Sequence, residues 1–182
     1  MMTRLELLFS AFAHQPESGS ENLRPASVTI REAKADDALE IARLATELGY
    51  PTEPDEMRKR LVKLISDRTH YVAVASGEDD DHLLGWVHAE HRISLEGGAR
   101  AELMGLVVDP VVRRGGIGGS LAELAEAWAS RRGLTKITVR SNLVRKEAHP
   151  FYQGLGYAHE KTQHVYAKLL SPDKHTEKRR NN

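Results

Sequence analysis

The chain has 182 residues, long enough for one domain with a substantial core and short for two. Its 26 basic and 26 acidic side chains cancel, which disfavours a general nucleic-acid binder and a protein held on an anionic membrane. It contains no cysteine, which excludes disulfides, thiolate metal sites and a thiol nucleophile, and no stretch reaches the ~20 apolar residues of a membrane span, so we expect a cytoplasmic protein.

The ends of the chain differ in composition from its middle. Residues 14–27 are rich in polar and turn-forming residues and have no apolar period. We therefore expect a flexible N-terminal segment over residues 1–27, one domain over residues 28–170 and a disordered tail over residues 171–182.

Within the domain, strand-like and helix-like patterns follow one another. The expected strands, which are apolar or alternating runs, are residues 28–30, 71–75, 83–93, 101–108, 136–139 and 164–169. The expected helices, which carry apolar residues at helical spacing, lie within residues 36–49, 57–65, 117–133 and 145–155. Trp128 falls on the apolar face of the third helix, so we expect it in the core.

A glycine-rich loop joins the strand 101–108 to the third helix. Residues 113–118 read Arg-Arg-Gly-Gly-Ile-Gly; such a turn aims main-chain N–H groups at an anion, and the following helix adds donors and a positive dipole end. A nucleotide-hydrolysing P-loop is excluded, because Gly119 stands between Gly118 and Ser120 where the motif needs a lysine. The dinucleotide fingerprint is excluded, because Leu121 occupies the place of its third small residue.

Two motifs in order resemble the GNAT superfamily of N-acetyltransferases. Arg113-x-x-Gly116-x-Gly118 after the run 106–110 (Leu-Val-Val-Asp-Pro) resembles its acyl-coenzyme A signature. Residues 141–157, with Ser-Asn followed by the pair Phe151-Tyr152, resemble its closing segment. The resemblance covers residues 28–170 and is specific over residues 102–157.

The resemblance implies an α/β (α+β) fold and an activity. The fold is a mixed, mostly antiparallel central sheet of six to seven strands, flanked by about four helices, with a splayed acyl-CoA cleft. The activity is direct transfer of an acetyl group from acetyl-CoA to a primary amine of a small molecule or peptide.

The resemblance also implies which residues hold the cofactor. The main chain of Leu106, Val107 and Val108 would pair with pantetheine as an added strand does. The residues of the pyrophosphate loop would be Arg113, Arg114, Gly115, Gly116, Ile117, Gly118 and Gly119. Asn142 would contact the pantetheine end, and Phe151 is either core or a wall for the pantetheine arm.

Amide formation requires a base, because an aliphatic ammonium must lose a proton before it attacks a thioester. Glu102 is the candidate, since period-two alternation places Leu106 and Val108 on its side of the strand. Many relatives carry this acid one or two positions closer to the loop; Glu90 and a substrate amine that is already neutral are the alternatives.

Tyr152 is the candidate acid. It occupies the position from which the family protonates the leaving thiolate, and the alternative is a tyrosine packed against the core.

Other interpretations remain open. A non-catalytic acyl-CoA-binding sensor or interaction module would keep the same pocket, and a nucleotide-binding module could use the same loop. The histidines support no metal site, because His88 and His91 lie three residues apart on a strand, where their rings point to opposite faces. The apolar faces leave a homodimer open, and the sequence does not identify the amine.

Overall fold

The computed structural model describes residues 27–78 and 81–170 and divides the chain into two compact units. The first unit is residues 1–140 and the second unit is residues 141–182. The tail expected over residues 171–182, and all but the last residue of the flexible segment expected over residues 1–27, lie outside the described residues.

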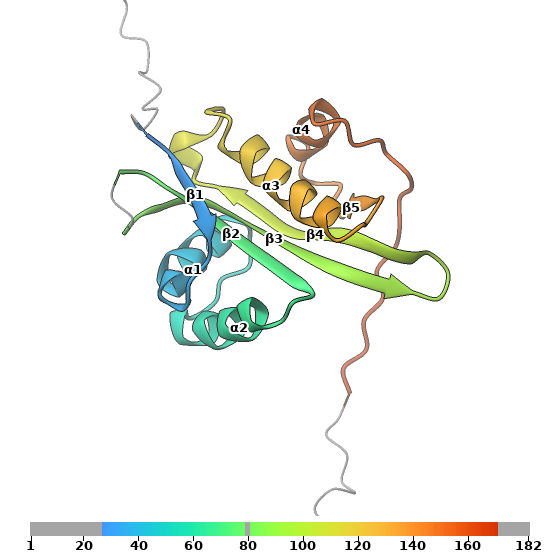
Figure 1. The fold of residues 1–182 in the computed structure, drawn as a ribbon, viewed down its shortest axis with the longest axis horizontal. Helices are drawn as coiled ribbons and strands as arrows, with labels where there is room; N and C mark the ends of the chain where they lie inside the picture. The colour runs from blue at the N-terminus through green and yellow to red at the C-terminus, as the bar shows by residue number, and fades with distance from the viewer. Residues whose placement is uncertain (1–26, 79–80, 171–182) are drawn as a thin grey trace, which may run out of the picture. The chain divides into compact units, whose positions relative to one another are not determined.

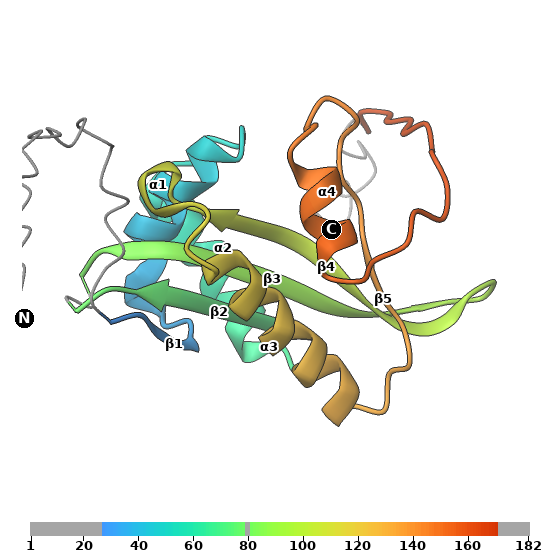
Figure 2. The same ribbon diagram turned by 90° about the horizontal axis from the view of Figure 1, so that it is seen from above.

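The first unit is built on a five-stranded sheet in the order β1-β2-β3-β4-β5. The strands are β1 (Thr29–Glu32), β2 (His70–Ser76), β3 (Leu83–Ser94), β4 (Gly98–Val108) and β5 (Ile137–Val139). Neighbours from β1 to β4 are antiparallel, and β5 runs parallel to β4. β3 and β4 form a long hairpin that extends past the end of the helix packed against it (Figure 2). The predicted mixed, mostly antiparallel sheet is confirmed, with five strands among the described residues in place of six to seven.

Helices cover both faces of this sheet (Figure 1). α1 (Ala38–Glu47) and α2 (Pro54–Ser66) pack together on one face, and α3 (Ile117–Arg131) packs on the other. We call these the α1/α2 face and the α3 face. Two short 3-10 helices, η1 (Ala35–Asp37) and η2 (Pro110–Val112), precede α1 and α3. Ile41, Leu44 and Ala45 of α1 are buried at the spacing that predicted the helix.

The core of the α3 face depends on one close approach. Leu121 of α3 is fully buried, which stabilises the fold by roughly 2–3 kcal/mol. A Cβ atom on Gly85 of β3 would lie 2.7 Å from the carbonyl oxygen of Val107 and 3.2 Å from Cδ1 of Leu121, so glycine lets β3, β4 and α3 meet here. Trp128 stacks on Tyr71 of β2 with ring centroids 5.7 Å apart, and its predicted place in the core is confirmed.

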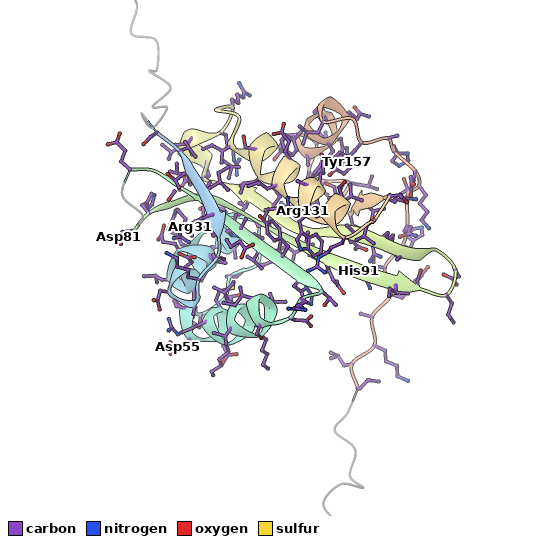
Figure 3. The ribbon with its side chains drawn as sticks, in the orientation of Figure 1. Arg31, Asp55, Asp81, His91, Arg131 and Tyr157 are labelled. Atoms are coloured by element: carbon purple, nitrogen blue, oxygen red, sulfur yellow. The ribbon has the colours of Figure 1, made fainter. Side chains whose placement is uncertain are left out.

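An ion pair ties β1 to the start of α1. Arg31, which is labelled in Figure 3, donates to both carboxylate oxygens of Asp37, each at 2.8 Å. Asp37 also accepts a hydrogen bond from the N–H of Lys34 at 2.6 Å and is 8% exposed. These contacts fix where α1 begins, and therefore which of its side chains reach the ends of β3 and β4.

Among its described residues the second unit contains one helix, α4 (Ala148–Gly154). The N–H of Ala148 bonds to the carbonyl of Arg145 in a turn, so the helix begins at Ala148 and not at the predicted Arg145. The strand predicted over residues 164–169 is wrong, because residues 158–170 form neither helix nor strand. An apolar alternation favours a strand, but a strand also needs a neighbour to satisfy its N–H and C=O groups.

Candidate functional site

A β-bulge interrupts β4 just before the run that leads to the glycine-rich loop. His88 of β3 pairs with Gly105, and the next residue, Ala89, pairs with Leu103, so Met104 is an extra residue on β4. β5 pairs with β4 only over residues 101–103. Beyond the bulge, within the described part of the first unit, no strand pairs with that side of β4. The sheet therefore opens between β4 and β5.

Two residues beyond the bulge present their peptide groups to this open edge. The N–H of Asp109 donates to the carbonyl of Leu84 at 2.8 Å, which sets the hydrogen-bonding parity of the β3–β4 ladder. By that parity the N–H and C=O of Leu106 and Val108 point away from β3, whereas those of Val107 point toward it. Nε of Arg113 donates to the carbonyl of Val108 at 3.2 Å.

The bulge also reverses the side-chain alternation along β4. Glu102 pairs with Glu90, whereas Leu106 pairs with Val87. Since successive residues of β3 point to opposite faces, Glu102 lies on the α1/α2 face and Leu106 on the α3 face. The expectation that Glu102 shares a face with Leu106 and Val108 is therefore wrong, because one inserted residue shifts the two-residue period.

The glycine-rich loop turns the chain from β4 into α3 through two residues in the left-handed region. Arg114 has φ 65°, which is uncommon for a residue with a side chain, and Gly116 has φ 90°. Arg113 and Arg114 are both exposed. The turn thus carries two solvent-facing guanidinium groups at the entrance to α3.

The first turn of α3 presents main-chain donors with no side-chain cap. Ser120 is the first residue whose N–H bonds back within the helix, to the carbonyl of Gly116 at 3.1 Å. The preceding N–H groups, those of Ile117, Gly118 and Gly119, have no acceptor inside the helix. The N-cap Gly116 has no side chain, and the first turn has no acidic residue. The donors and the positive dipole end therefore suit an anion such as phosphate.

Glu102, the predicted base, is buried and held by two arginines. Only 3% of Glu102 is exposed, so it is not a surface glutamate. Nη1 of Arg92 lies 3.2 Å from its Oε2, and Nε of Arg140 lies 3.2 Å from its Oε1. An amine that reaches this carboxylate has to compete with both guanidinium groups. Glu90, the alternative, is half-buried with Nε of Arg92 3.9 Å from its Oε2.

A pair of imidazoles lies beside the bulge on the same face. Nδ1 of His70 and Nε2 of His88 are 3.0 Å apart, and His88 is the residue that pairs with Gly105 across the ladder. Burial, assisted by the neighbouring His70, lowers the pKa of His88 to about 4. His88 is therefore neutral at neutral pH. The sequence predicted that His88 and His91 lie on opposite faces, but it did not predict the partner of His88, which strand pairing brings from 18 residues away.

The sequence did not predict one ion pair, which lies where the chain leaves β4 for the loop. Nη1 of Arg43 in α1 lies 2.8 Å from Oδ2 of Asp109, the residue that follows β4. The two residues are 66 positions apart, so no local pattern joins them.

The remaining predicted site residues belong to the second unit and are described by their contacts there. Oδ1 of Asn142 accepts from the N–H of Val144 at 3.2 Å. The ring of Tyr152 meets Phe151 and Tyr157 edge to face, with centroids 5.0 and 5.6 Å away. Burial raises the pKa of Tyr152, and the positive charge of Arg145 offsets part of that effect. Its phenol therefore stays protonated at neutral pH.

Two further observations concern the described residues only. They contain no group of three histidine, aspartate or glutamate side chains that could hold a metal ion. None of the helices in the same ranges is long and apolar enough to cross a membrane.

Comparison with known families gives one match that spans both units. The family model described as the acetyltransferase (GNAT) family matches residues 35–157. This stretch begins at η1 and ends just after α4, and it includes the bulge, the open edge and the loop. A search of the curated proteins finds no match to the sequence.

Solved structures share the fold. An aminoglycoside antibiotic 6'-N-acetyltransferase from Acinetobacter baumannii has a TM-score of 0.68 at 24% identity over 80% of this chain and 100% of that one. An aminoglycoside N-acetyltransferase in complex with CoA has a TM-score of 0.71 at 17% identity over 81% and 99%. Glucosamine-6-phosphate N-acetyltransferase from Arabidopsis thaliana has a TM-score of 0.67 at 17% identity over 78% and 98%. At these identities the likeness shows the fold.

Proposed function

Because the chain belongs to the acetyltransferase (GNAT) family, we propose that it is an acetyl-CoA-dependent N-acetyltransferase that acts on a primary amine. One observation carries this proposal. The open edge of β4 beyond Met104 runs directly into a loop that ends in the uncapped first turn of α3. An acyl-CoA needs these two sites in this order. Its amide-rich pantetheine arm can pair with a strand edge, and its pyrophosphate can accept hydrogen bonds from N–H donors.

In this proposal the main chain binds most of the cofactor. Leu106 and Val108 offer N–H and C=O groups to the pantetheine amides, and Arg113 moves from the Val108 carbonyl when the arm binds. The first-turn donors of α3 hold the pyrophosphate, and the exposed Arg114 adds positive charge. The coenzyme supplies the activated acetyl thioester. Asn142 and Phe151 remain proposed contacts of the pantetheine end and arm.

With no cysteine in the chain, the amine attacks the thioester directly and the protein manages the protons. Glu102 remains the proposed base, and its carboxylate reaches the amine once the more exposed of its two partners, Arg140, swings away. Tyr152 remains the proposed acid. It enters the reaction protonated and gives its proton to the leaving thiolate, and release of the thiol draws the transfer forward.

The amine is proposed only as a class. Solved neighbours are named for aminoglycosides and for glucosamine 6-phosphate, and both classes present a primary amine. A small molecule or a peptide amine is therefore the proposed acceptor.

The test begins with binding. Isothermal calorimetry should detect acetyl-CoA binding to the parent, and Gly116→Val, which places a side chain at φ 90°, should weaken it. Gly133→Val, which places the same side chain at φ 72° beyond the far end of α3, is the matched control and should leave binding unchanged. Failure of the parent to bind CoA or acetyl-CoA would overturn the proposal.

Turnover is then measured by CoA release over a panel of amines that includes kanamycin and glucosamine 6-phosphate. A thiol reagent reports only the released CoA, because the protein has no thiol. Tight binding with no release over the whole panel would instead support a non-catalytic acyl-CoA-binding module. The engagement of Glu102 by two arginines is the observation that favours this second candidate.

A further inference from the structure

Arg43 joins three separate parts of the first unit. From α1 it donates to Oδ2 of Asp109 at 2.8 Å, to the carbonyl of Leu83 at 2.9 Å and to the carboxylate of Glu40 at 3.0 and 3.1 Å. Oε2 of Glu40 also accepts from the N–H of Leu83 at 3.2 Å. One guanidinium therefore links α1 to the start of β3 and to the end of β4. We call Glu40, Arg43 and Asp109 the Arg43 cluster.

Asp109 is the residue at which the chain leaves the sheet for the loop. Its N–H donates to the carbonyl of Leu84, one residue beyond the end of β4. Its Oδ1 accepts a hydrogen bond from the N–H of Val111 at 3.0 Å, at the start of η2. Burial alone would raise the pKa of Asp109, but the Val111 N–H and the Arg43 guanidinium outweigh it, and the pKa lies below its usual value. Asp109 is thus an ionised carboxylate, 6% exposed, with Arg43 as its guanidinium partner.

We propose that Arg43 is a positioning residue for the phosphate loop. Through Asp109 it fixes the direction in which residues 110–116 leave β4, and hence how the loop meets the first turn of α3. The inference rests on the proposed function, because the binding of the CoA pyrophosphate is what would depend on this alignment. Arg43 is on the α1/α2 side of the sheet, and of its acceptors only Asp109 leads into the loop, so its effect on the loop passes through Asp109.

The chemistry of the cluster requires arginine at this position. A guanidinium is a planar fork with several donors, and Arg43 uses Nε, Nη1 and Nη2 toward three different acceptors. A lysine ammonium could meet the carboxylate of Asp109 or the carbonyl of Leu83, but it cannot span the fork that joins them. Arg43→Lys should therefore retain the charge and lose part of the alignment.

The experiment compares two ligands that differ at the pyrophosphate. The dissociation constant for CoA is measured by calorimetry, and that for pantetheine, which has no phosphate, by NMR amide shifts at Leu106 and Val108. In Arg43→Gln the affinity for CoA should fall about 10- to 100-fold, as expected when a charge-assisted hydrogen bond to phosphate is misaligned. The affinity for pantetheine should stay within about 2-fold, which is below the effect of one ordinary hydrogen bond.

Control variants separate positioning from general damage. Arg58→Gln breaks a 2.8 Å ion pair of the same type between α2 and Asp36 and should alter neither affinity. If Arg43 acts through Asp109, the double variant Arg43→Gln/Asp109→Asn should lose no more CoA affinity than Asp109→Asn does. Arg43→Lys, which keeps the charge, should lie between the parent and Arg43→Gln and gives a reading even if Arg43→Gln folds poorly.

Different outcomes of these measurements would contradict the inference alone or the proposed function as well. Unchanged CoA affinity in Arg43→Gln and Arg43→Lys would overturn the inference while leaving the proposed function standing. Equal losses for CoA and pantetheine would also overturn it, because they would show a structural role only. A parent that binds pantetheine and CoA equally weakly would contradict both, since the loop would then hold no pyrophosphate.

Discussion

Replacing His88 with glutamine should reduce the fall in the free energy of unfolding that accompanies a fall in pH below about 6.5. The folded chain holds this imidazole on the α1/α2 face with Nε2 3.0 Å from Nδ1 of His70, and burial, followed by the effect of His70, lowers its pKa from 6.5 to about 4. In the unfolded chain the imidazole is solvated and has its ordinary pKa of about 6.5. The two states therefore bind different numbers of protons at mildly acidic pH.

The sign follows from proton linkage. Above about pH 6.5 both states keep His88 neutral, and its contribution to the pH dependence is zero. Below that pH the unfolded state takes up the proton and the folded state does not, so the free energy of unfolding falls as pH falls. At about 1.36 kcal/mol per pH unit the loss is about 2 kcal/mol by pH 5 and about 3 kcal/mol by pH 4.

Urea unfolding between pH 5 and 7.5 measures this directly in the parent and in His88→Gln. The difference between their free energies of unfolding should grow in favour of the variant as the pH falls, because glutamine does not titrate. His159→Gln, at an exposed histidine, should run parallel to the parent. Parallel curves for the parent and His88→Gln would refute the reasoning, since they would mean that the folded and unfolded states charge this imidazole alike.

Two further predictions concern packing on the α3 face. Leu121→Ala should lower the free energy of unfolding by about 3 kcal/mol with no change in the urea m-value, because the fully buried side chain leaves a cavity, whereas Leu121→Met should cost under about 1.5 kcal/mol. Gly85→Ala should cost about 1–3 kcal/mol, because its Cβ would lie 2.7 Å from the backbone oxygen of Val107 and the strands would have to move apart. Gly77→Ala, whose Cβ would meet only Leu84 at 4.0 Å, is the matched control, and equal melting temperatures for the two alanine variants would contradict the argument.

The elements of the first unit were predictable because their signals are local. Apolar spacing in α1 and α3 records the one buried face of each helix, and the apolar runs of β2 to β4 record strands that are covered on both faces of the sheet. The segment 164–169 carries the same kind of alternation, yet it forms no strand in the structure. Alternation reports which side chains could be buried together. Whether a strand forms depends on a neighbouring edge, which one segment does not encode.

The same division holds for the candidate site. The loop could be predicted from residues 113–119, because its donors are main-chain groups of consecutive residues and glycine reports where the chain turns. The Arg43–Asp109 contact and the His70–His88 pair could not, since each joins side chains brought together by helix docking or strand register. Glu102 could be identified as a carboxylate on the right strand, but its two arginine partners come from β3 and from the residue after β5.

The bulge at Met104 explains why two-residue alternation wrongly predicted that Glu102 shares a face with Leu106 and Val108. Before the bulge the N–H of Ala101 donates to the carbonyl of Lys136, so the odd-numbered peptide groups of β4 face β5; beyond it the parity changes, and Leu106 and Val108 face that edge. The same inserted residue turns Val107 toward the core of the α1/α2 face. In an unbulged strand, the peptide groups that face β5 would continue at odd-numbered residues, whose side chains point to the face opposite that of Glu102. Here the main-chain groups proposed for the cofactor lie in the plane of the sheet, while the carboxylate lies on the α1/α2 face. An amine that uses Glu102 must therefore approach the bulge from the side of α1 and α2.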